Sequence, residues 1–466
     1  MNACVVIYNL RIALKNMQGD GAAVITMTDI KAGVTGAKAA AILLAAADTA
    51  VKDRALNAMI GALDAHRKVI LDANAADMKA AEKMKAAGEL TDAMVKRLKV
   101  NDEKIDGMID GIKDVVKQKD PVGETMSATE LDDDLMLYQV RCPIGLIGVI
   151  FESRPDVVPQ IMSLCLKSGN AVVFKGGKEA SGTNKALFGI LSEAAYGAGI
   201  PKGAFCLMET REDVSAILKM DEAIDLLIPR GSNEFVRYIQ SNTKIPVLGH
   251  AAGMCHVYVD EFADEDMALS VSLDSKIQYP AVCNASENLL VHSKIADSFL
   301  PKMADLFIKN GVEVRADDET MRIVRSAKIK KATEEDWDTE YNDLIISIKV
   351  VGSLDEAIGF VNRHGSGHSD TIVTENKANA LRFTSLVDSS TVLVNASTRF
   401  PDGYRYGKGA EVGISTNKIH ARGPVGMEGL MIYKYILVGK GHVMKDYAGK
   451  NGRKFKHRVT DKKFGL

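Results

Sequence analysis

From residue 145 onward, short uninterrupted apolar runs alternate with stretches of helical pattern. We predict strands at residues 146–151, 171–174, 205–208 and 224–228. Helices are predicted at 155–167 and 179–196, between the first three strands, and at 231–241, after the fourth. A strand that is apolar throughout is buried on both faces, which is typical of a parallel sheet covered by helices. The sequence therefore predicts an α/β fold that binds nucleotides beyond the carboxyl ends of its strands.

A second series of strand-like runs follows the first. We predict these strands at residues 256–259, 288–291, 312–315, 345–351, 371–374 and 392–394, with helices between most of them. A chain of 466 residues is too long for one hydrophobic core. The two series are therefore interpreted as two Rossmann-like parallel-sheet domains.

The segments that flank these series have a different pattern. Residues 37–84 predict two or three long helices, and residues 90–119 continue the helical pattern. Residues 135–141 predict one strand of a projecting hairpin, and residues 430–438 predict another strand. Exposed apolar strands aggregate unless another subunit covers them, so we expect a homo-oligomer, a dimer or larger.

The two ends of the chain carry no recognised signal. Residues 1–26 lack the leading basic residues of a secretory signal and are interpreted as an extension without a targeting role. The basic tail, residues 441–466, is expected to be a solvated, disordered end, with nucleic-acid binding as the alternative.

Charge and cysteine content exclude several classes of protein. A net charge of -2 gives no global field for nucleic acid or an anionic membrane, and no apolar run reaches about 18 residues, the length of a membrane span. The six cysteines are scattered without CxxC spacing, which indicates reduced thiols in the cytoplasm and argues against a zinc site or a disulfide framework.

Cys283 lies in a short loop between a predicted helix at 264–277 and the strand at 288–291. Loops held by rigid elements often carry catalytic groups, and a thiolate is a strong nucleophile beside polar neighbours such as Asn284. The alternative is a small buried apolar residue, as most free cysteines are.

Two strand-to-helix turns could hold a phosphate. In the first, Lys175 and Lys178 flank two glycines, and in the second Gly231 and Ser232 open a helix whose amides are free. There is no GxGxxG or Walker motif, so a lysine-bearing turn and an ordinary helix cap remain the alternatives.

Other polar residues also follow predicted strands. Arg154 could bind a carboxylate or phosphate through two parallel hydrogen bonds, with a surface arginine as the alternative. Ser397 and Arg399 belong to a segment, residues 395–400, that is rich in hydrogen-bond donors. His250 could be an acid or a base, or a structural histidine.

Taken together, six stretches resemble the aldehyde dehydrogenase superfamily, and more narrowly its gamma-glutamyl phosphate reductases. The resemblance runs from about residue 27 to about residue 438. In chain order the stretches are CPIGLIGVIFESRPDVVPQ, SLCLKSGNAVVFKGGKEA, VLGHAAGMCHVYVD, YPAVCNASENLLV, EAIGFVNRHGSGHSDTIVT and VNASTRFPDGYRYGKGAEVGISTNKIHARGPVGMEGL.

The resemblance implies an aldehyde dehydrogenase-like fold in three parts. These are an NADP-binding domain (27–133 and 144–248), a catalytic domain (249–420) and an oligomerisation arm (134–143 and 421–440). It also implies that the cofactor lies between the first two parts.

The resemblance further implies roles for individual residues. Cys283 matches the nucleophile, and Asn284 with nearby backbone amides would stabilise the oxyanion. Lys175 and Lys178 match the segment that holds the adenosine ribose and its phosphate. Gly231 and Ser232 match the turn beside the pyrophosphate, and Glu340 matches the glutamate near the nicotinamide ribose.

Two residues suggest which reaction the chain performs. Hydrolytic members of the superfamily carry a water-activating glutamate where this chain has His250, so an acyl-phosphate substrate is expected, with a hydrolytic aldehyde dehydrogenase as the alternative. Lys178 stands where NAD-preferring relatives often carry a glutamate, so NADPH is expected.

The implied substrate is L-glutamyl 5-phosphate. Arg154 and Arg399 are candidates for its phosphate and α-carboxylate, in either assignment, with His250 and Ser397 also at the substrate. Because the acyl phosphate is labile, channelling from a glutamate 5-kinase is possible. A non-catalytic binding protein on the same scaffold is a further alternative.

Overall fold

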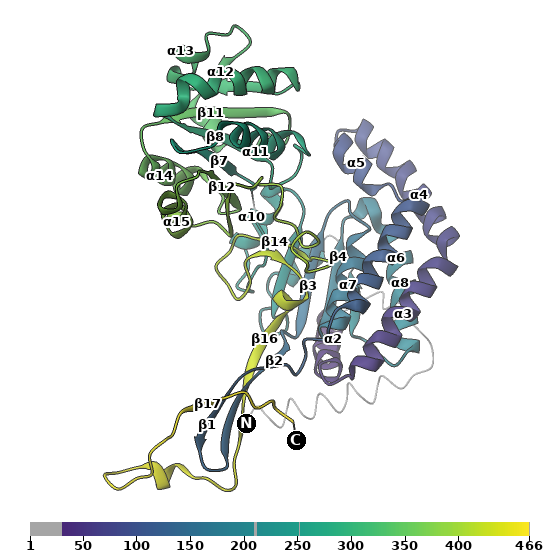
Figure 1. Cartoon of the computed structure of the whole chain (residues 1–466). Coiled ribbons are helices and arrows are strands. Elements are labelled where there is room, and N and C mark those ends of the chain that lie inside the picture. Colours follow the sequence, from purple (N-terminus) through teal and green to yellow (C-terminus); the bar gives the residue numbers. More distant parts are fainter. Residues whose placement is uncertain (1–29, 209–211, 251, 466) are drawn as a thin grey trace.

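The computed structural model describes residues 30–208, 212–250 and 252–465. It contains two parallel sheets with their helices and a projecting arm (Figure 1). The extension at residues 1–26 lies outside the described residues. Within the described part, no helix is both long and apolar enough to cross a membrane.

The chain begins with a group of helices, as predicted. They are α2 (Ile30–Leu44), α3 (Thr49–Ala65), α4 (Arg67–Ala86), α5 (Asp92–Leu98) and α6 (Asp102–Lys117). The side chains of Thr91 and Asn101 accept backbone N–H bonds at the starts of α5 and α6, which supplies partners for otherwise free amides. Helix α6 buries a stripe that ends with Ile112 and Val115, and this stripe joins it to the core of the first sheet.

The first sheet is parallel, with strand order β5-β4-β3-β6. Its strands are β3 (Leu146–Phe151), β4 (Ala171–Gly176), β5 (Phe205–Met208) and β6 (Leu226–Arg230). Its helices are α7 (Val157–Lys167), α8 (Ser181–Gly197), α9 (Glu212–Ile217) and α10 (Asn233–Ser241), with a short 3-10 turn, η1 (Lys178–Ala180).

Alternate residues of β3 face opposite layers of this sheet. Ile147 and Val149 join the core formed with α3, α6, α7 and α8, whereas Leu146 and Ile150 join the core formed with α2 and α10. The all-apolar run is therefore explained by burial on both faces, as the sequence predicted.

The second sheet is also parallel, with order β10-β9-β11-β8-β7-β12-β13. Its strands are β7 (Cys255–Val259), β8 (Ser286–His292), β9 (Glu313–Ala316), β10 (Lys330–Lys331), β11 (Ile345–Val351), β12 (Ser369–Val373) and β13 (Thr391–Val394). Its helices are α11 (Glu265–Ile277), α12 (Ser293–Lys309), α13 (Asp318–Val324), α14 (Leu354–His364) and α15 (Lys377–Leu386), with the 3-10 turn η2 (Glu334–Asp338). The predicted α/β class is confirmed for both sheets.

Between the second sheet and the arm, the chain forms a small antiparallel pair. This pair consists of β14 (Gly413–Ser415) and β15 (Gly423–Val425), and the 3-10 turn η3 (Met427–Leu430) follows it. In Figure 1 the pair lies where the two parallel-sheet units meet. The loops around it therefore lie close to the carboxyl ends of β3 and β6.

The arm is an antiparallel sheet of order β16-β2-β1-β17 that projects from the rest of the molecule (Figure 1). Its strands are β1 (Thr125–Asp132), β2 (Leu135–Pro143), β16 (Met431–Val438) and β17 (Arg458–Thr460). The predicted hairpin strand pairs with β1, which the sequence analysis did not identify. Strand β16 forms one edge of the sheet and exposes Tyr435 and Leu437.

The expectation of a disordered tail is wrong. Strand β17 adds to β1, and the 3-10 turn η4 (Met444–Tyr447) precedes it. Arg458 and Lys456 form ion pairs with Glu130 on β1, and Arg453 forms one with Asp132 at 2.8 Å. The basic residues therefore complement carboxylates on a strand more than 300 positions earlier, a pairing that only the fold creates.

Candidate active site

The loop that carries Cys283 is held tightly between α11 and β8. The amide of Ala285 donates to the carbonyl of Val282 at 2.9 Å, which closes a turn around Cys283. Gly253 packs directly against this turn, because a Cβ atom at Gly253 would lie 2.4 Å from the Cα atom of Cys283 and 2.3 Å from its carbonyl oxygen. The position of the cysteine therefore depends on the absence of a side chain at residue 253.

Two imidazoles lie beside the thiol of Cys283. Cys283 Sγ, a ring nitrogen of His250 and a ring nitrogen of His368 are all within 4.8 Å of one another. The two rings meet edge to face, with their centroids 5.1 Å apart. The sequence analysis selected His250 but missed His368, although His368 lies inside one of the six stretches that carried the resemblance.

Burial governs the protonation of this cluster. Burial raises the pKa of Cys283 to about 12; the carboxylates of Glu340 and Glu411 act in the same direction, and Arg230 opposes them. Burial lowers the pKa of His250 and lowers that of His368 well below its ordinary value. At neutral pH the Cys283 thiol and the imidazoles of His250 and His368 are therefore all uncharged.

Arg230, at the end of β6, is a site residue that the sequence analysis missed. Its guanidinium packs over Gly413, where a Cβ atom would lie 2.6 Å from Nη1 and where φ is +151°. Burial lowers the pKa of Arg230 to about 10, and Arg154 adds to that effect. Its Nε atom is buried and has no hydrogen-bond partner among the described residues. Arg230 therefore retains donor capacity for an anionic ligand.

Two of the predicted cofactor segments meet, although they belong to different sheets. The Ser232 side chain caps α10 by accepting from the amide of Phe235 at 3.3 Å. Its neighbour Asn233 donates to Glu340 Oε2 at 2.5 Å. The turn at Gly231 and Ser232 thus lies beside Glu340, and the ordinary helix cap given as the alternative is also present.

The predicted lysine turn lies at the ends of β4 and β5. Lys175 Nζ donates to the carbonyl of Gly176 at 2.5 Å, and Lys178 forms a 2.8 Å ion pair with Glu89. A small cavity opens here, lined by Gly176, Gly177, Ser181, Asn184, Lys185, Leu207 and Met208. Within the described chain the buried Oδ1 atom of Asn184 has no donor, so this lining keeps an unused hydrogen-bond acceptor.

The predicted substrate-binding residues differ in how many of their polar atoms already form contacts within the protein. Arg154 is partly exposed and lies 3.8 Å from Asp156. Arg399 Nε donates to Gln278 Oε1 at 2.9 Å, and burial lowers the pKa of Arg399. Ser397 is buried and its hydroxyl accepts from Ser275 and from the amide of Arg399.

Asn284 follows the cysteine directly, and its side chain is buried. Its Nδ2 atom donates to the carbonyl of Pro401 at 2.9 Å. Its Oδ1 atom is buried without a partner in the part of the chain that the structure describes. The amide is thus fixed against the segment that also carries Arg399, and one of its two N–H groups remains for another acceptor.

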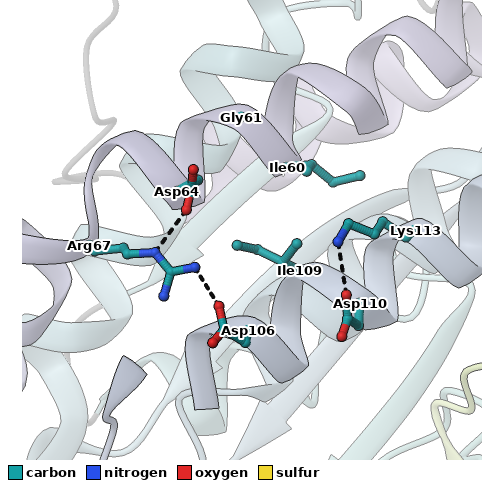
Figure 2. A pocket seen from close by; sticks show the side chains of 8 residues that line it. All are labelled: Ile60, Gly61, Asp64, Arg67, Asp106, Ile109, Asp110 and Lys113. Carbon is teal, nitrogen blue, oxygen red and sulfur yellow. Dashed lines mark hydrogen bonds and ion pairs between the residues drawn. The ribbon is translucent and has the colours of Figure 1, made fainter. Parts of the chain in front are cut away.

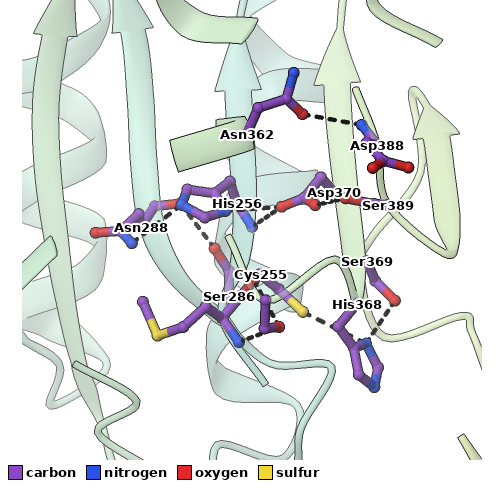
Figure 3. Close-up of polar contacts among 12 residues, drawn as sticks. Cys255, His256, Ser286, Asn288, Asn362, His368, Ser369, Asp370, Asp388 and Ser389 are labelled. Atoms are coloured by element: carbon purple, nitrogen blue, oxygen red, sulfur yellow. Dashed lines mark hydrogen bonds and ion pairs between the residues drawn. The ribbon is translucent and has the colours of Figure 1, made fainter. Parts of the chain in front are cut away.

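A buried polar network lies at the ends of the strands that border the cysteine loop (Figure 3). His256 Nδ1 and Asp370 Oδ1 are 2.8 Å apart, and Asn288 Nδ2 donates to the carbonyl of Trp337 at 3.2 Å. Cys255 Sγ donates to the carbonyl of Cys283 at 3.2 Å and also contacts His368 Nδ1 at 3.7 Å. Strands β7, β8 and β12 are thereby connected to the loop that they position.

A buried ion pair lies on the same sheet. Lys276, near the end of α11, donates to Glu287 Oε2 on β8 at 2.6 Å, and both side chains are almost fully buried. Burial raises the pKa of Glu287 to about 7, although Lys276 opposes this, and burial also lowers the pKa of Lys276. The pair joins the two elements on either side of the Cys283 loop.

A cavity of about 510 Å³ lies elsewhere, between α3 and α6 (Figure 2). Its charged groups are paired with one another: Arg67 with Asp64 and Asp106, and Lys113 with Asp110. These pairs leave little net charge for a ligand. We therefore assign the active site to the cysteine loop and not to this cavity.

Comparison with known proteins places this site in a family. The chain matches the aldehyde dehydrogenase family over residues 24–336. It is 62% identical over 440 residues to the gamma-glutamyl phosphate reductase of Methanosarcina mazei, a match that spans 94% of this chain and 98% of that protein. It is 54% identical over 429 residues to the enzyme of the same name from Pelotomaculum thermopropionicum, spanning 92% and 97% of the two chains.

A solved structure agrees with this result. The gamma-glutamyl phosphate reductase of Thermotoga maritima is 42% identical, with a TM-score of 0.86, and the match covers 89% of this chain and 99% of that one. The chain belongs to the aldehyde dehydrogenase family, and within it to the gamma-glutamyl phosphate reductases. The resemblance stated from the sequence is therefore confirmed. The family uses nicotinamide cofactors.

Proposed function

We propose that the chain catalyses the NADPH-dependent reduction of L-glutamyl 5-phosphate to L-glutamate 5-semialdehyde and phosphate, the second step of proline biosynthesis from glutamate. The observation that carries this proposal is the 62% identity to a gamma-glutamyl phosphate reductase across 98% of that protein's length. The placement of Cys283 between arginines and histidines supports it.

In this proposal Cys283 is the nucleophile. Its sulfur attacks the acyl carbon, the bond from that carbon to the phosphate oxygen breaks, and phosphate leaves while a thioester forms on Cys283. The thiol proton passes first to a base, and the uncharged imidazoles of His250 and His368, each with a ring nitrogen within 4.8 Å of the sulfur, are the candidates to accept it. The backbone amides at residues 283–285 and the Asn284 amide are the candidates for stabilising the oxyanion.

Arginines from both sheets supply positive charge around the cysteine. Arg230 ends β6 and Arg154 follows β3 in the first sheet, whereas Arg399 follows β13 in the second. Negative charge on Cys283 acts to raise the pKa of both Arg230 and Arg399. We assign the phosphate and the α-carboxylate of the substrate to these guanidiniums. Arg230 joins Arg154 and Arg399 as a candidate because its Nε lacks a partner among the described residues.

Bound NADPH would supply the hydride that converts the thioester to the aldehyde. The residues that would hold it are Lys175 and Lys178 at the adenosine end, Gly231 and Ser232 beside the pyrophosphate, and Glu340 near the nicotinamide ribose. The small cavity beside β4 and the contact between Asn233 and Glu340 fit this order along one ligand.

The domain roles follow from the same proposal. Residues 27–133 and 144–248 would bind NADPH, residues 249–420 would carry the chemistry, and residues 134–143 and 421–440 would join subunits in a homo-oligomer. The exposed apolar side chains of β16 support the last assignment. A cytoplasmic location and channelling from a glutamate 5-kinase complete the proposal.

The reverse reaction tests the proposed function. L-Glutamate 5-semialdehyde, phosphate and NADP should yield NADPH with the wild-type chain, and the rate should depend on phosphate. If NADPH forms equally well without phosphate and glutamate accumulates, the chain is a hydrolytic aldehyde dehydrogenase and the acyl-phosphate proposal fails.

A further inference from the structure

We propose that His250, Cys283 and His368 form a binding site for one thiophilic divalent cation of the Zn²⁺ class, and that this cation reversibly caps the nucleophile. The three ligands come from three separate loops, which precede β7, β8 and β12. The inference concerns binding by the resting protein and does not depend on the proposed reaction.

The ligand set is one that zinc prefers. Thiolate sulfur and neutral imidazole nitrogen are its usual protein ligands, and three protein ligands with one open position are typical of accessible zinc sites. His250 Nδ1 is 2.9 Å from the carbonyl of Ile414, so Nδ1 carries the proton and Nε2 presents a lone pair. A hydrogen bond from the second ring nitrogen to a carbonyl is also the usual support for a metal-binding histidine.

The burial of His368 also supports this cation site. Its side chain is completely buried, and its Nδ1 atom contacts Ser369 Oγ at 2.8 Å. Its Nε2 atom is also buried and has no hydrogen-bond partner within the described ranges. An imidazole nitrogen without a partner is unfavourable in a protein interior unless a ligand uses it.

The geometry requires only a small adjustment. With bonds of about 2.3 Å to sulfur and about 2.0–2.1 Å to nitrogen, a tetrahedral cation places its ligand atoms about 3.3–3.6 Å apart. The ligand atoms here are within 4.8 Å of one another. Small torsional changes in Cys283 and His250, which are only half-buried, would close this difference.

The chemistry of capping is a proton-for-metal exchange. The S–H bond of Cys283 breaks, its proton passes to solvent, and a sulfur–metal bond forms without oxidation or reduction. The cation draws electron density from the bound sulfur and blocks the approach of an acyl carbon, so the capped thiolate is a much weaker nucleophile. The sequence analysis argued against a zinc site, because the ligands stand at positions 250, 283 and 368 and follow no local spacing.

The test is metal binding by the full-length chain, freed of metal with a chelator. Equilibrium dialysis against ZnCl₂ should give close to one Zn²⁺ per chain, and CoCl₂ should give an absorption band from sulfur-to-cobalt charge transfer. Cys283→Ser should abolish that band, and His368→Ala should weaken Zn²⁺ binding by at least about tenfold. Zn²⁺ should also slow alkylation of Cys283 by iodoacetamide, measured by mass spectrometry.

Matched variants separate this site from adventitious binding. Cys142→Ser removes a thiol in the arm, and His364→Ala removes an imidazole only four residues from His368; both should bind Zn²⁺ like the wild type. If His368→Ala fails to fold by circular dichroism, His250→Gln takes its place. The proposal is overturned if the wild type binds no stoichiometric Zn²⁺, or if Cys283→Ser retains both the affinity and the cobalt band.

Discussion

Both parallel sheets are covered by helices, but the side chains on their central strands differ in kind. All six residues of β3 in the first sheet are buried, and all are apolar. The second sheet buries His256, Asn288 and Asp370 on its central strands, and each of them forms a hydrogen bond across strands or to a neighbouring turn. The side chains of β3 thus pack by non-directional burial, whereas those on the central strands of the second sheet also form directional polar contacts.

The difference follows from what each sheet has to position. In the proposed function the first sheet presents the turns that hold the cofactor through backbone amides and lysines. The second sheet positions a single sulfur atom, and directional hydrogen bonds restrict a loop more than apolar packing does. Arg230 of the first sheet reaches the neighbourhood of Cys283, so the site depends on both kinds of support.

The largest effect is expected from the substitution that removes the sulfur atom positioned by the second sheet. Cys283→Ser should lower the rate of NADPH formation in the reverse assay by at least about a thousandfold, because a serine hydroxyl is a far weaker nucleophile. Thermal unfolding should stay close to that of the wild type. Cys142→Ser, a thiol change in the arm, should retain activity. Substantial turnover by Cys283→Ser would contradict a covalent mechanism.

The next change breaks the polar support of the second sheet. Lys276→Met leaves Glu287 buried without its cation and should lower the free energy of unfolding by about 3–5 kcal/mol, measured by urea denaturation. Ile147→Val in the first sheet should cost only about 0.5–1.5 kcal/mol. Equal losses at the two positions would contradict the contrast between the sheets.

The Lys276→Met variant also has a defined pH dependence. Because burial raises the folded-state pKa of Glu287 above its ordinary value of 4.5, ionising this carboxyl opposes folding as the pH rises. The loss in the free energy of unfolding caused by Lys276→Met should therefore become smaller as the pH falls toward 4.5. The double variant Lys276→Met with Glu287→Leu should recover much of the lost stability at neutral pH. If the lost free energy of unfolding does not change with pH, the destabilisation comes from lost packing contacts of the Lys276 side chain and not from the charge of Glu287.

A smaller effect is expected from moving the cysteine loop without altering its chemistry. In Gly253→Ala the new methyl group would meet the backbone of Cys283 at 2.3–2.4 Å, so the loop has to shift. A displacement of this kind should reduce kcat by about a hundredfold. Gly359→Ala in α14 is the control, because a Cβ atom there meets nothing within 4 Å. Unchanged kcat in Gly253→Ala would show that the loop tolerates displacement.

The smallest expected effect concerns the first sheet. Lys178→Glu places a carboxylate where the proposal has the 2′-phosphate of NADP, beside Glu89, which now pairs with Lys178. The KM for NADP should rise by about tenfold more than the KM for NAD. Steady-state kinetics with both cofactors measure this ratio. Equal changes in the two KM values would remove Lys178 from the proposed specificity.

Much of the fold could be predicted from the sequence because its signals are local. The runs at 146–151, 205–208 and 345–351 coincide with β3, β5 and β11, since an apolar run bounded by turns predicts a buried strand without knowledge of its partners. Strand β1 was missed because only some of its residues are apolar and its partners are distant in sequence. The tail was misjudged for a similar reason, since its basic residues are ordered by Glu130 and Asp132.

By itself the sequence determined the α/β class, the order of the two sheets, the family and the loop that carries Cys283. Each of these depends on periodicity or on contiguous motifs, which neighbouring residues encode. Only the tertiary structure brought His368 and Arg230 to the sulfur of Cys283, and it alone placed Glu340 beside the turn at Ser232. These contacts join positions tens to more than a hundred residues apart. The contact of His368 forms when strands distant in sequence share a sheet, and those of Arg230 and Glu340 form only when the two sheets come together.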